Sequence, residues 1–558
     1  MSYLRKIVSG GMAAALLIGT MTFTAPESKP AAAAPDEYHD DWLHVNENAE
    51  IVDMNGNPVW LTGCNWFGYN VTTQCFDGVW SRNMHEMLNE MADHGFNLMR
   101  VPMSTQILLQ WKNNDPDPYM VKINEWKNPE LTVEGVEGGT PKYSFDIWNM
   151  AVNWCRENGI KIMIDIHSAT TASNGHQMPL WYDSNYSTDD WLEALAWFAD
   201  YYKDDDTILA IDLKNEPHGK NDGQGMAIWD DSTAENNWKY AAERGAAAVL
   251  EKNPNLLIMV EGIEVYPKFE NGKDWNSPAI DYTHYDDPSA QAFHGAWWGG
   301  NFRGAREYPV DLGEYQSQLV YSPHDYGPLV WEQEWFKKDF TRQTLLDDYW
   351  YDTWAFLIEE KISPLLMGEW GGFIDDEHDP TGDNRKWMKI LRDYMIEKRI
   401  HHTFWCFNEN SGDTGGLLIN DFQAWDEEKY AFVEPSLWQD KNGKFISLDH
   451  KIPLGQSGNG ISLSDYYNGS PNPSESSSSS DTSGTEEDIC YGDSNEDGEV
   501  NLADAVLIMQ HLANPSKYHI TKQGIKNADC SGGYDGMTSS DAFAIQKYVL
   551  GIIGKLPE

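Results

Sequence analysis

Two glutamates, Glu216 and Glu369, each stand at the end of a short apolar run that suits a buried strand. Two carboxylates on different strands suit glycoside hydrolysis, because one must be protonated to donate to the leaving oxygen while the other must be ionised to attack the anomeric carbon. Arg100 and Tyr326 are expected near Glu369, where they would hold it as an anion. That negative neighbour would raise the pKa of Glu216, so the surroundings would separate an acid from a nucleophile.

Other apolar runs also end in polar or aromatic side chains. Taken singly, each has a structural explanation, because an arginine and a glutamate could form a structural ion pair and a histidine could be hydrogen-bonded in the core. Taken together they indicate one site, since buried charged groups need partners. These further residues are His167, Asn215, His324 and Trp405.

The elements that must position these side chains are eight short apolar runs, most of them separated by segments with apolar residues at helical spacing. Alternating strands and helices predict an α/β fold, and eight strands favour a closed (β/α)8 TIM barrel, whose chemistry gathers at the C-terminal strand ends. A doubly wound open sheet is the alternative, but no glycine-rich phosphate loop follows the first run. The predicted strands are 61–68, 96–103, 160–168, 208–216, 256–262, 319–326, 364–371 and 402–408.

Four motifs in this order resemble family 5 of the glycoside hydrolases, a group of retaining (β/α)8 enzymes. They are Phe-Asn-Leu-Met-Arg-Val-Pro at 96–102, Leu-Lys-Asn-Glu-Pro-His at 213–218, Ser-Pro-His-Asp-Tyr at 322–326 and Met-Gly-Glu-Trp at 367–370. Matched motif by motif, the resemblance implies that Glu216 is the acid/base and Glu369 the nucleophile. It also implies that Asn215 binds the sugar 2-hydroxyl, that Arg100 and Tyr326 orient the nucleophile, that His167 and His324 line the cleaved subsite, and that Trp405 stacks beneath its ring.

Four aromatic or glycine-rich stretches look like the cellulase branch of that family, at 65–68, 180–182, 297–301 and 411–416. This implies cellulose or a soluble β-1,4-glucan as substrate, with endo action. A mannanase, xyloglucanase or mixed-linkage glucanase on the same barrel stays open, and so does a non-catalytic glycan-binding protein. The long segment 264–311 departs from the expected pattern and leaves endo against exo action open. Candidate stacking platforms, for each of which barrel packing is the alternative, are Trp66, Trp181, Trp297 and Trp298.

Composition divides the chain into four parts. Residues 1–34 are expected to be a signal peptide, with Arg5 and Lys6 before an apolar stretch and alanines at 31–34, so secretion follows; a retained membrane anchor is the alternative. The catalytic domain is predicted at 35–454, a Ser/Gly/Pro-rich linker at 455–488 and a small domain at 489–558. The net charge of −48 argues against nucleic-acid and anionic-membrane partners. Cys64 with Cys75, or Cys490 with Cys530, could form disulfides.

The small domain carries an EF-hand-like loop, with oxygen ligands at the positions that bind calcium and Gly498 at the turn. A second, less regular copy follows 37 residues later. The predicted ligands are Asp493, Asn495, Asp497, Glu499 and Asp504 in the first loop, and Asp529, Ser531, Asp535 and Asp541 in the second.

This tandem pair resembles a type I dockerin over about Ile489 to Leu556. The resemblance implies a small all-α module with structural Ca²⁺, a cohesin on a scaffold protein as partner, and an extracellular cellulosome as its location. Leu502, Ala503, Ser539 and Ser540 would contact the cohesin. No cofactor is expected for catalysis.

Overall fold

The protein is described from a computed structural model. The described residues are 41–115, 121–223, 225–279, 291–468, 491–495, 500–513, 518, 520, 522–531, 537–550, 552–553 and 555–556. The chain divides into two compact units, one up to residue 472 and one from residue 473. The predicted signal peptide lies outside the described residues. Among the helices that are described, none is long and apolar enough to span a bilayer.

The large unit is built around an eight-stranded sheet in the order β10-β7-β6-β5-β4-β3-β12-β11, with every pairing parallel. Parallel bridges from Tyr321 to Leu365 and from His324 to Glu369 join its two edges, so the sheet closes into the predicted barrel and the open-sheet alternative is wrong. The strands are β3 Thr62–Asn65, β4 Leu98–Ser104, β5 Lys161–Ser168, β6 Ile208–Asp212, β7 Leu257–Val260, β10 Leu319–Tyr321, β11 Leu366–Met367 and β12 His401–Phe404.

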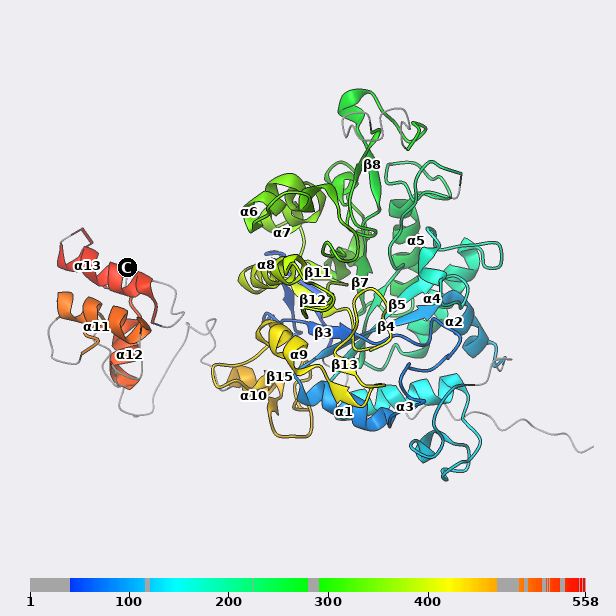
Figure 1. Cartoon of the computed structure of the whole chain (residues 1–558), viewed down its shortest axis with the longest axis horizontal. Helices are drawn as coiled ribbons and strands as arrows, with labels where there is room; N and C mark the ends of the chain where they lie inside the picture. The colour runs from blue at the N-terminus through cyan, green and yellow to red at the C-terminus, as the bar shows by residue number, and fades with distance from the viewer. Residues whose placement is uncertain are drawn as a thin grey trace, which may run out of the picture. The chain divides into compact units, whose positions relative to one another are not determined.

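Helices surround the strands of the large unit (Figure 1). Helix α1 shows why they form: Met84, Met87, Leu88 and Met91 recur at helical spacing and are buried, and Asn83 caps the first turn through its side chain. The helices are α1 Met84–Asp93, α2 Thr105–Lys112, α3 Ser144–Glu157, α4 Thr188–Tyr201, α5 Trp238–Leu250, α6 Arg342–Leu345, α7 Phe356–Glu359, α8 Asp383–Lys398 and α9 Glu427–Val433, with a π-helical stretch Leu346–Ala355 between α6 and α7.

Four two-stranded sheets lie outside the barrel sheet in the described residues. They pair β1 His44–Val45 with β2 Ile51–Val52, β8 Val265–Pro267 with β9 Phe293–Gly295, β13 Leu418–Ile419 with β14 Ala424–Trp425, and β15 Phe445–Ile446 with β16 Gly460–Ile461. The pair β8 and β9 occupies the long segment after β7, of which residues 280–290 lie outside the description.

The start of the predicted linker at residue 455 is wrong. Strand β16 pairs with β15, and helix α10 (Leu463–Asn468) follows it. Leu463 is fully buried and Tyr466 packs edge-on against Trp438, with ring centroids 5.2 Å apart. These apolar side chains hold the segment against the barrel, so the folded large unit extends through at least residue 468.

The small unit contains three described helices, α11 Leu502–Ala513, α12 Lys522–Ala528 and α13 Ser539–Val549. Its buried core includes Ala505 and Ile508 of α11, and Ala542 and Ile545 of α13. These are the positions that the 37-residue repeat makes equivalent, so the repeat places matching residues in one core.

Cys64 and Cys75 are both buried free thiols, so the possible disulfide between them is absent. Cys530 is also a buried free thiol, and Cys490 lies outside the described residues.

Candidate active site

The predicted site residues meet at the C-terminal ends of the barrel strands. Arg100 lies on β4 and is fully buried. Its guanidinium lies 2.9 Å from Oε1 of Glu369 and 2.9 Å from Oδ2 of Asp212, and contacts Glu261 at 3.2 Å and Asp165 at 3.3 Å. The buried cation thus contacts four carboxyl groups, more than are needed to balance its charge.

Glu369 follows β11 and is nearly fully buried. The hydroxyl of Tyr326 donates to its Oε2 at 2.6 Å, and Arg100 donates to its Oε1. Burial would raise the pKa of Glu369, but the charges of His324 and Arg100 and the Tyr326 hydrogen bond hold it below the usual 4.5. Glu369 is therefore an anion with both oxygens oriented.

Glu216 follows β6, and its side chain is 13% exposed. Burial, together with the negative charge of Glu369, raises its pKa to about 7, against the opposing contact with His324. Its backbone has a φ of 49°, in the left-handed region that costs a residue with a Cβ about 1 to 2 kcal/mol. The protonated side chain thus sits on a turn that the surrounding structure must stabilise.

His324 lies between the two glutamates. Its Nδ1 is 3.1 Å from Oε1 of Glu216 and 3.6 Å from Oε2 of Glu369. One oxygen of each carboxylate and a His324 nitrogen all lie within 4.8 Å of one another. The nearest oxygens of the two carboxyl groups are thus no more than 4.8 Å apart, a close approach that suits the roughly 5 Å separation of a retaining pair.

Asn215, His167 and Trp405 line the same rim. Arg100 donates to Oδ1 of Asn215 at 3.0 Å, while the buried Nδ2 of Asn215 has no hydrogen-bond partner among the described residues. Nδ1 of His167 is hydrogen-bonded to Oδ2 of Asp165 at 2.6 Å. The ring of His167 is nearly parallel to the partly exposed ring of Trp405, with centroids 5.9 Å apart. An unpaired amide donor and an exposed aromatic face are the two kinds of group that bind a hydroxylated ring.

Two of the four predicted platforms are wrong. Trp66 is fully buried, stacked 4.2 Å from Phe76, and its Nε1 donates to the carbonyl of Asp77. Trp181 is 1% exposed and packs against Trp238. Neither ring has a free face for a sugar, so both are core residues.

The other two predicted platforms lie beside the site. Trp297 is 8% exposed and packs edge-on against Tyr326, with centroids 5.9 Å apart. Trp298 is partly exposed, and one of its faces stacks on His218, which follows Glu216 by two positions, at 3.8 Å and 3°.

Sequence reasoning missed five polar residues of the site. Asn65 and Glu261 stand at or just beyond the ends of the first and fifth strands, the same signal that identified the others. Asp165 lies within β5, Asp212 ends β6 and Lys214 follows it, but all three lie inside the predicted runs 160–168 and 208–216, so no strand-end signal marked them. Burial raises the pKa of Asp165 to about 7, of Asp212 to about 6 and of Glu261 to about 8, despite nearby cations.

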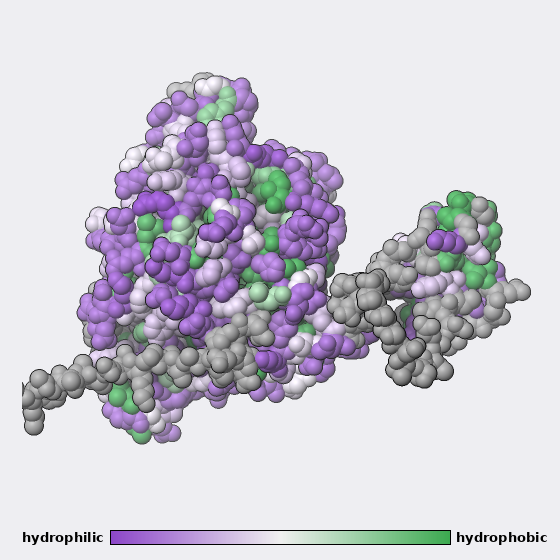
Figure 2. All heavy atoms as spheres, turned by 180° about the vertical axis from the view of Figure 1, so that it is seen from behind, coloured by the Kyte–Doolittle hydropathy of each residue, from purple (hydrophilic) through white to green (hydrophobic). Residues whose placement is uncertain are grey.

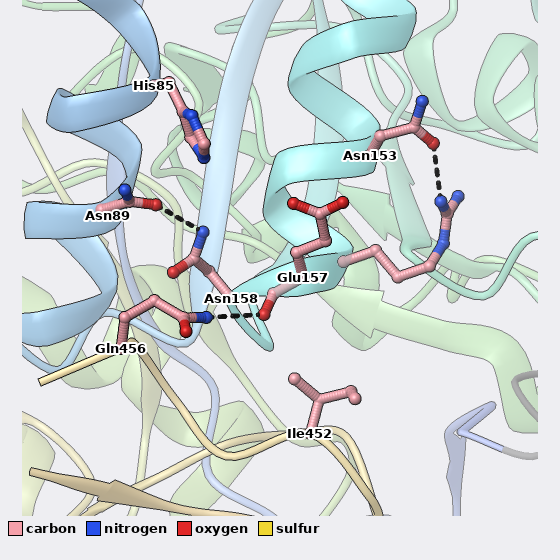
Figure 3. A pocket seen from close by; sticks show the side chains of 8 residues that line it. His85, Asn89, Asn153, Glu157, Asn158, Ile452 and Gln456 are labelled. Carbon is pink, nitrogen blue, oxygen red and sulfur yellow. Dashed lines mark hydrogen bonds between the residues drawn. The ribbon is translucent and has the colours of Figure 1, made fainter. Parts of the chain in front are cut away.

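A separate pocket of about 720 Å³ lies on the outside of the barrel, between α1, α3 and the segment near residue 452 (Figure 3). All but one of its lining residues have polar side chains, and they include none of the strand-end residues. The pocket is therefore distinct from the candidate active site. It is lined by His85, Asn89, Asn153, Arg156, Glu157, Asn158, Ile452 and Gln456.

The closed barrel, with an ionised and a protonated carboxyl group facing each other at its strand ends, defines the class of barrel glycoside hydrolases. Residues 52–411 match the family model described as cellulase, glycosyl hydrolase family 5. The chain is 49% identical over 515 residues to Endoglucanase G of Acetivibrio thermocellus, covering 88% of each chain. It is 40% identical over 530 residues to Endoglucanase B of the same organism, covering 90% of each.

A solved structure extends this comparison. The endocellulase from Pyrococcus horikoshii, in complex with cellotetraose, matches with a TM-score of 0.59 and 30% identity over 71% of this chain and 98% of that one. The protein belongs to glycosyl hydrolase family 5, the cellulase family, and is a glycoside hydrolase.

Proposed function

We propose that the protein is a secreted, retaining endo-β-1,4-glucanase in which Glu369 is the nucleophile and Glu216 the acid/base. The observation that carries this proposal is the pair of facing carboxyl groups, with oxygens within 4.8 Å of each other and pKa values shifted in opposite directions. Two curated relatives named endoglucanases and an endocellulase solved with cellotetraose support a β-1,4-glucan as the substrate.

The reaction proceeds in two balanced steps. An ionised oxygen of Glu369 attacks the anomeric carbon and the glycosidic C–O bond breaks, while Glu216 gives its proton to the departing oxygen. A water then attacks the same carbon and releases Glu369, while Glu216 takes the water's proton. Two inversions leave the sugar configuration retained.

The remaining side chains bind and orient the sugar at the cleaved bond. The free Nδ2 of Asn215 donates to the 2-hydroxyl, a contact that tightens as positive charge develops on the ring. Trp405 offers a ring face beneath that sugar, with His167 beside it, and Trp297 and Trp298 serve the neighbouring sugars. Arg100 and Tyr326 orient Glu369.

A panel of purified polysaccharides tests the substrate and the mode of attack. We expect carboxymethyl-cellulose to be cleaved fastest, with its viscosity falling long before many reducing ends appear, because endo cuts shorten chains early. Much faster hydrolysis of mannan, xyloglucan or mixed-linkage glucan would contradict the assignment to cellulose, and a slow viscosity fall would contradict endo action.

The activity should depend on pH as a bell-shaped curve. Glu216 must hold its proton to act as acid, so kcat/KM should fall as pH rises through about 7. Glu369 must be ionised, so the acidic limb should lie below the ordinary pKa of a glutamate. Burial raises the pKa of Glu369, but the charges of His324 and Arg100 and the hydrogen bond from Tyr326 lower it by more. Initial rates on carboxymethyl-cellulose across pH measure both limbs; an alkaline limb near pH 4 would contradict the assignment of Glu216.

We further propose that the small unit is a dockerin that binds Ca²⁺ and a cohesin in a cellulosome. The ligand set consists of hard oxygens, which calcium prefers. Asp504 and Asp541 hold equivalent places in the two loops, are fully buried and accept backbone N–H groups of their own loops, from Asn495 at 3.2 Å and from Ser531 at 2.8 Å. Asp497, Glu499 and Asp535 lie outside the described residues.

Apolar side chains on the surface of the small unit suit a protein partner, and Figure 2 shows hydrophobic residues gathered there. Leu502, Val506 and Met509 of α11 recur at helical spacing and are each about half exposed. Phe543 of α13, the repeat equivalent of Val506, is 59% exposed. Such a row on a small helical unit favours docking to another protein.

Calcium should contribute directly to the stability of the small unit, because its core is small and Asp504 and Asp541 each bring a buried carboxylate into a loop. We expect calorimetry of the full chain to show two transitions, of which a chelator lowers only that of the small unit, by roughly 10 °C or more. The barrel transition is the internal control. Unchanged melting of both transitions would contradict structural calcium.

A further inference from the structure

Glu261 is a fully buried carboxylate just beyond β7 that contacts the acid/base directly. Its Oε2 accepts a hydrogen bond from the backbone N–H of Glu216 at 2.7 Å. Its Oε1 lies 3.2 Å from Nε2 of His324 and 3.2 Å from Nη2 of Arg100. The indole N–H of Trp238 donates to the backbone carbonyl of Glu261 at 2.7 Å and so fixes the residue at the rim.

The loop that faces Glu261 is shaped to leave room for this carboxylate. Gly299 has a φ of 72°, and a Cβ atom at this position would lie 2.1 Å from Oε2 of Glu261 and 3.4 Å from Cα of Glu216. A side chain larger than hydrogen at Gly299 would therefore push the carboxylate away from the Glu216 amide.

The hydrogen bond from Glu216 to Glu261 stabilises a backbone conformation that Glu216 would otherwise avoid. With a φ of 49°, the amide of Glu216 points toward β7 and its side chain toward Glu369. Glu261 therefore helps to determine where the Glu216 carboxyl group stands.

His324 provides a second path from Glu261 to Glu216. Its Nε2 faces Glu261, and its Nδ1 faces Glu216 and Glu369. Burial would lower the pKa of His324, but these carboxylates raise it well above 6.5, so the ring carries a proton on both nitrogens. Through this 3.2 Å contact Glu261 contributes to the charge and the placement of the ring that contacts the Glu216 carboxyl group.

We infer that Glu261 is a positioning residue for proton transfer: it holds the backbone of Glu216 in its left-handed conformation and anchors His324 against the Glu216 side chain. This inference rests on the proposed role of Glu216 as acid/base. It predicts that loss of Glu261 damages the step that needs a proton more than the step that needs a nucleophile. A substrate with a poor leaving group needs that proton, whereas a dinitrophenyl glycoside leaves without it.

The test compares two substrates for the Glu261→Gln variant, which keeps the shape of the side chain but replaces one of the two carboxyl oxygens, each of which faces a donor, with an NH2 group. We expect kcat/KM to fall by about 100-fold on cellotetraose and by no more than about 5-fold on 2,4-dinitrophenyl β-cellobioside. The ratio kcat/KM reports steps up to formation of the glycosyl-enzyme, so later hydrolysis does not mask the difference.

Two further variants keep the test decisive. Gly299→Ala should reproduce the split between substrates, because its Cβ displaces the same carboxylate; it carries the test if the Glu261 variant does not fold. Asp212→Asn removes a buried carboxylate that contacts Arg100 and not the Glu216 amide. It should therefore lower kcat/KM by a similar factor on both substrates. Melting temperatures confirm folding of each variant.

The inference is overturned if Glu261→Gln keeps wild-type rates on both substrates, or if it lowers both by the same factor as Asp212→Asn does. If the proposed function itself is wrong, the result differs, because the wild-type protein would then release no sugar from cellotetraose.

Discussion

Glu369→Gln is expected to lower kcat on carboxymethyl-cellulose by about 10⁴-fold or more, while the fold stays intact. The amide keeps the volume of the carboxyl group: its oxygen can still accept from Arg100, and its NH2 group can donate to the hydroxyl oxygen of Tyr326. It cannot form a covalent bond to the anomeric carbon, so the first step of the reaction is lost. Reducing-end release measures the rate, and the melting temperature shows that the barrel is folded.

A matched control uses Glu377, an exposed carboxylate that follows the same strand and has no part in the proposed chemistry. Glu377→Gln should retain wild-type activity. Trapping with a 2-fluoro glycoside, followed by peptide mapping, should label Glu369 in the wild-type protein. A label on another residue, or a Glu369→Gln variant within 10-fold of wild type, would refute its role as nucleophile.

Glu216→Ala is expected to lower kcat/KM on cellotetraose by about 10³-fold and to leave 2,4-dinitrophenyl β-cellobioside nearly as good a substrate for the first step. The reason is that only the natural leaving group needs a proton. With the second step lacking its base, the glycosyl-enzyme should accumulate on the aryl substrate. Added azide, which needs no base, should restore turnover and yield a β-glycosyl azide.

Glu235, an exposed carboxylate on the same segment between β6 and α5, provides the control. Glu235→Ala should match wild type on both substrates and show no response to azide. An equal loss on both substrates for Glu216→Ala, or an α-configured azide product, would contradict acid/base catalysis by Glu216 in a retaining mechanism.

The barrel was predictable because buried parallel strands must be apolar on both faces, which makes each one a short, recognisable run. The polar strand ends were predictable for a related reason, since a polar residue that ends such a run needs a partner at the rim. Glu261 ends the fifth run in the same way and was passed over. Asp165 and Asp212 could not be assigned to the site from the sequence, because their partner Arg100 comes from another strand and only folding of the barrel brings it to them.

The tryptophans show where local reasoning stops. Trp66 and Trp405 stand at or just beyond the ends of barrel strands, and each was predicted to stack on a sugar ring. Trp66 turns into a cluster with Phe76 and Phe407, whereas Trp405 keeps part of its ring exposed beside His167. The difference is set by the neighbours that each ring meets after the chain folds, of which Phe407 for Trp66 and His167 for Trp405 come from distant parts of the sequence.

The buried centre around Arg100 also links the stability of the barrel to proton uptake. Asp165, Asp212, Glu216 and Glu261 all have pKa values raised to between about 6 and about 8, so they bind protons that the unfolded chain releases near pH 4. Folding therefore takes up protons at neutral pH, and the stability that these groups contribute is lost as pH rises through that range. The raised pKa values that keep these carboxyl groups protonated thus also make the folded barrel less stable as pH rises toward about 8.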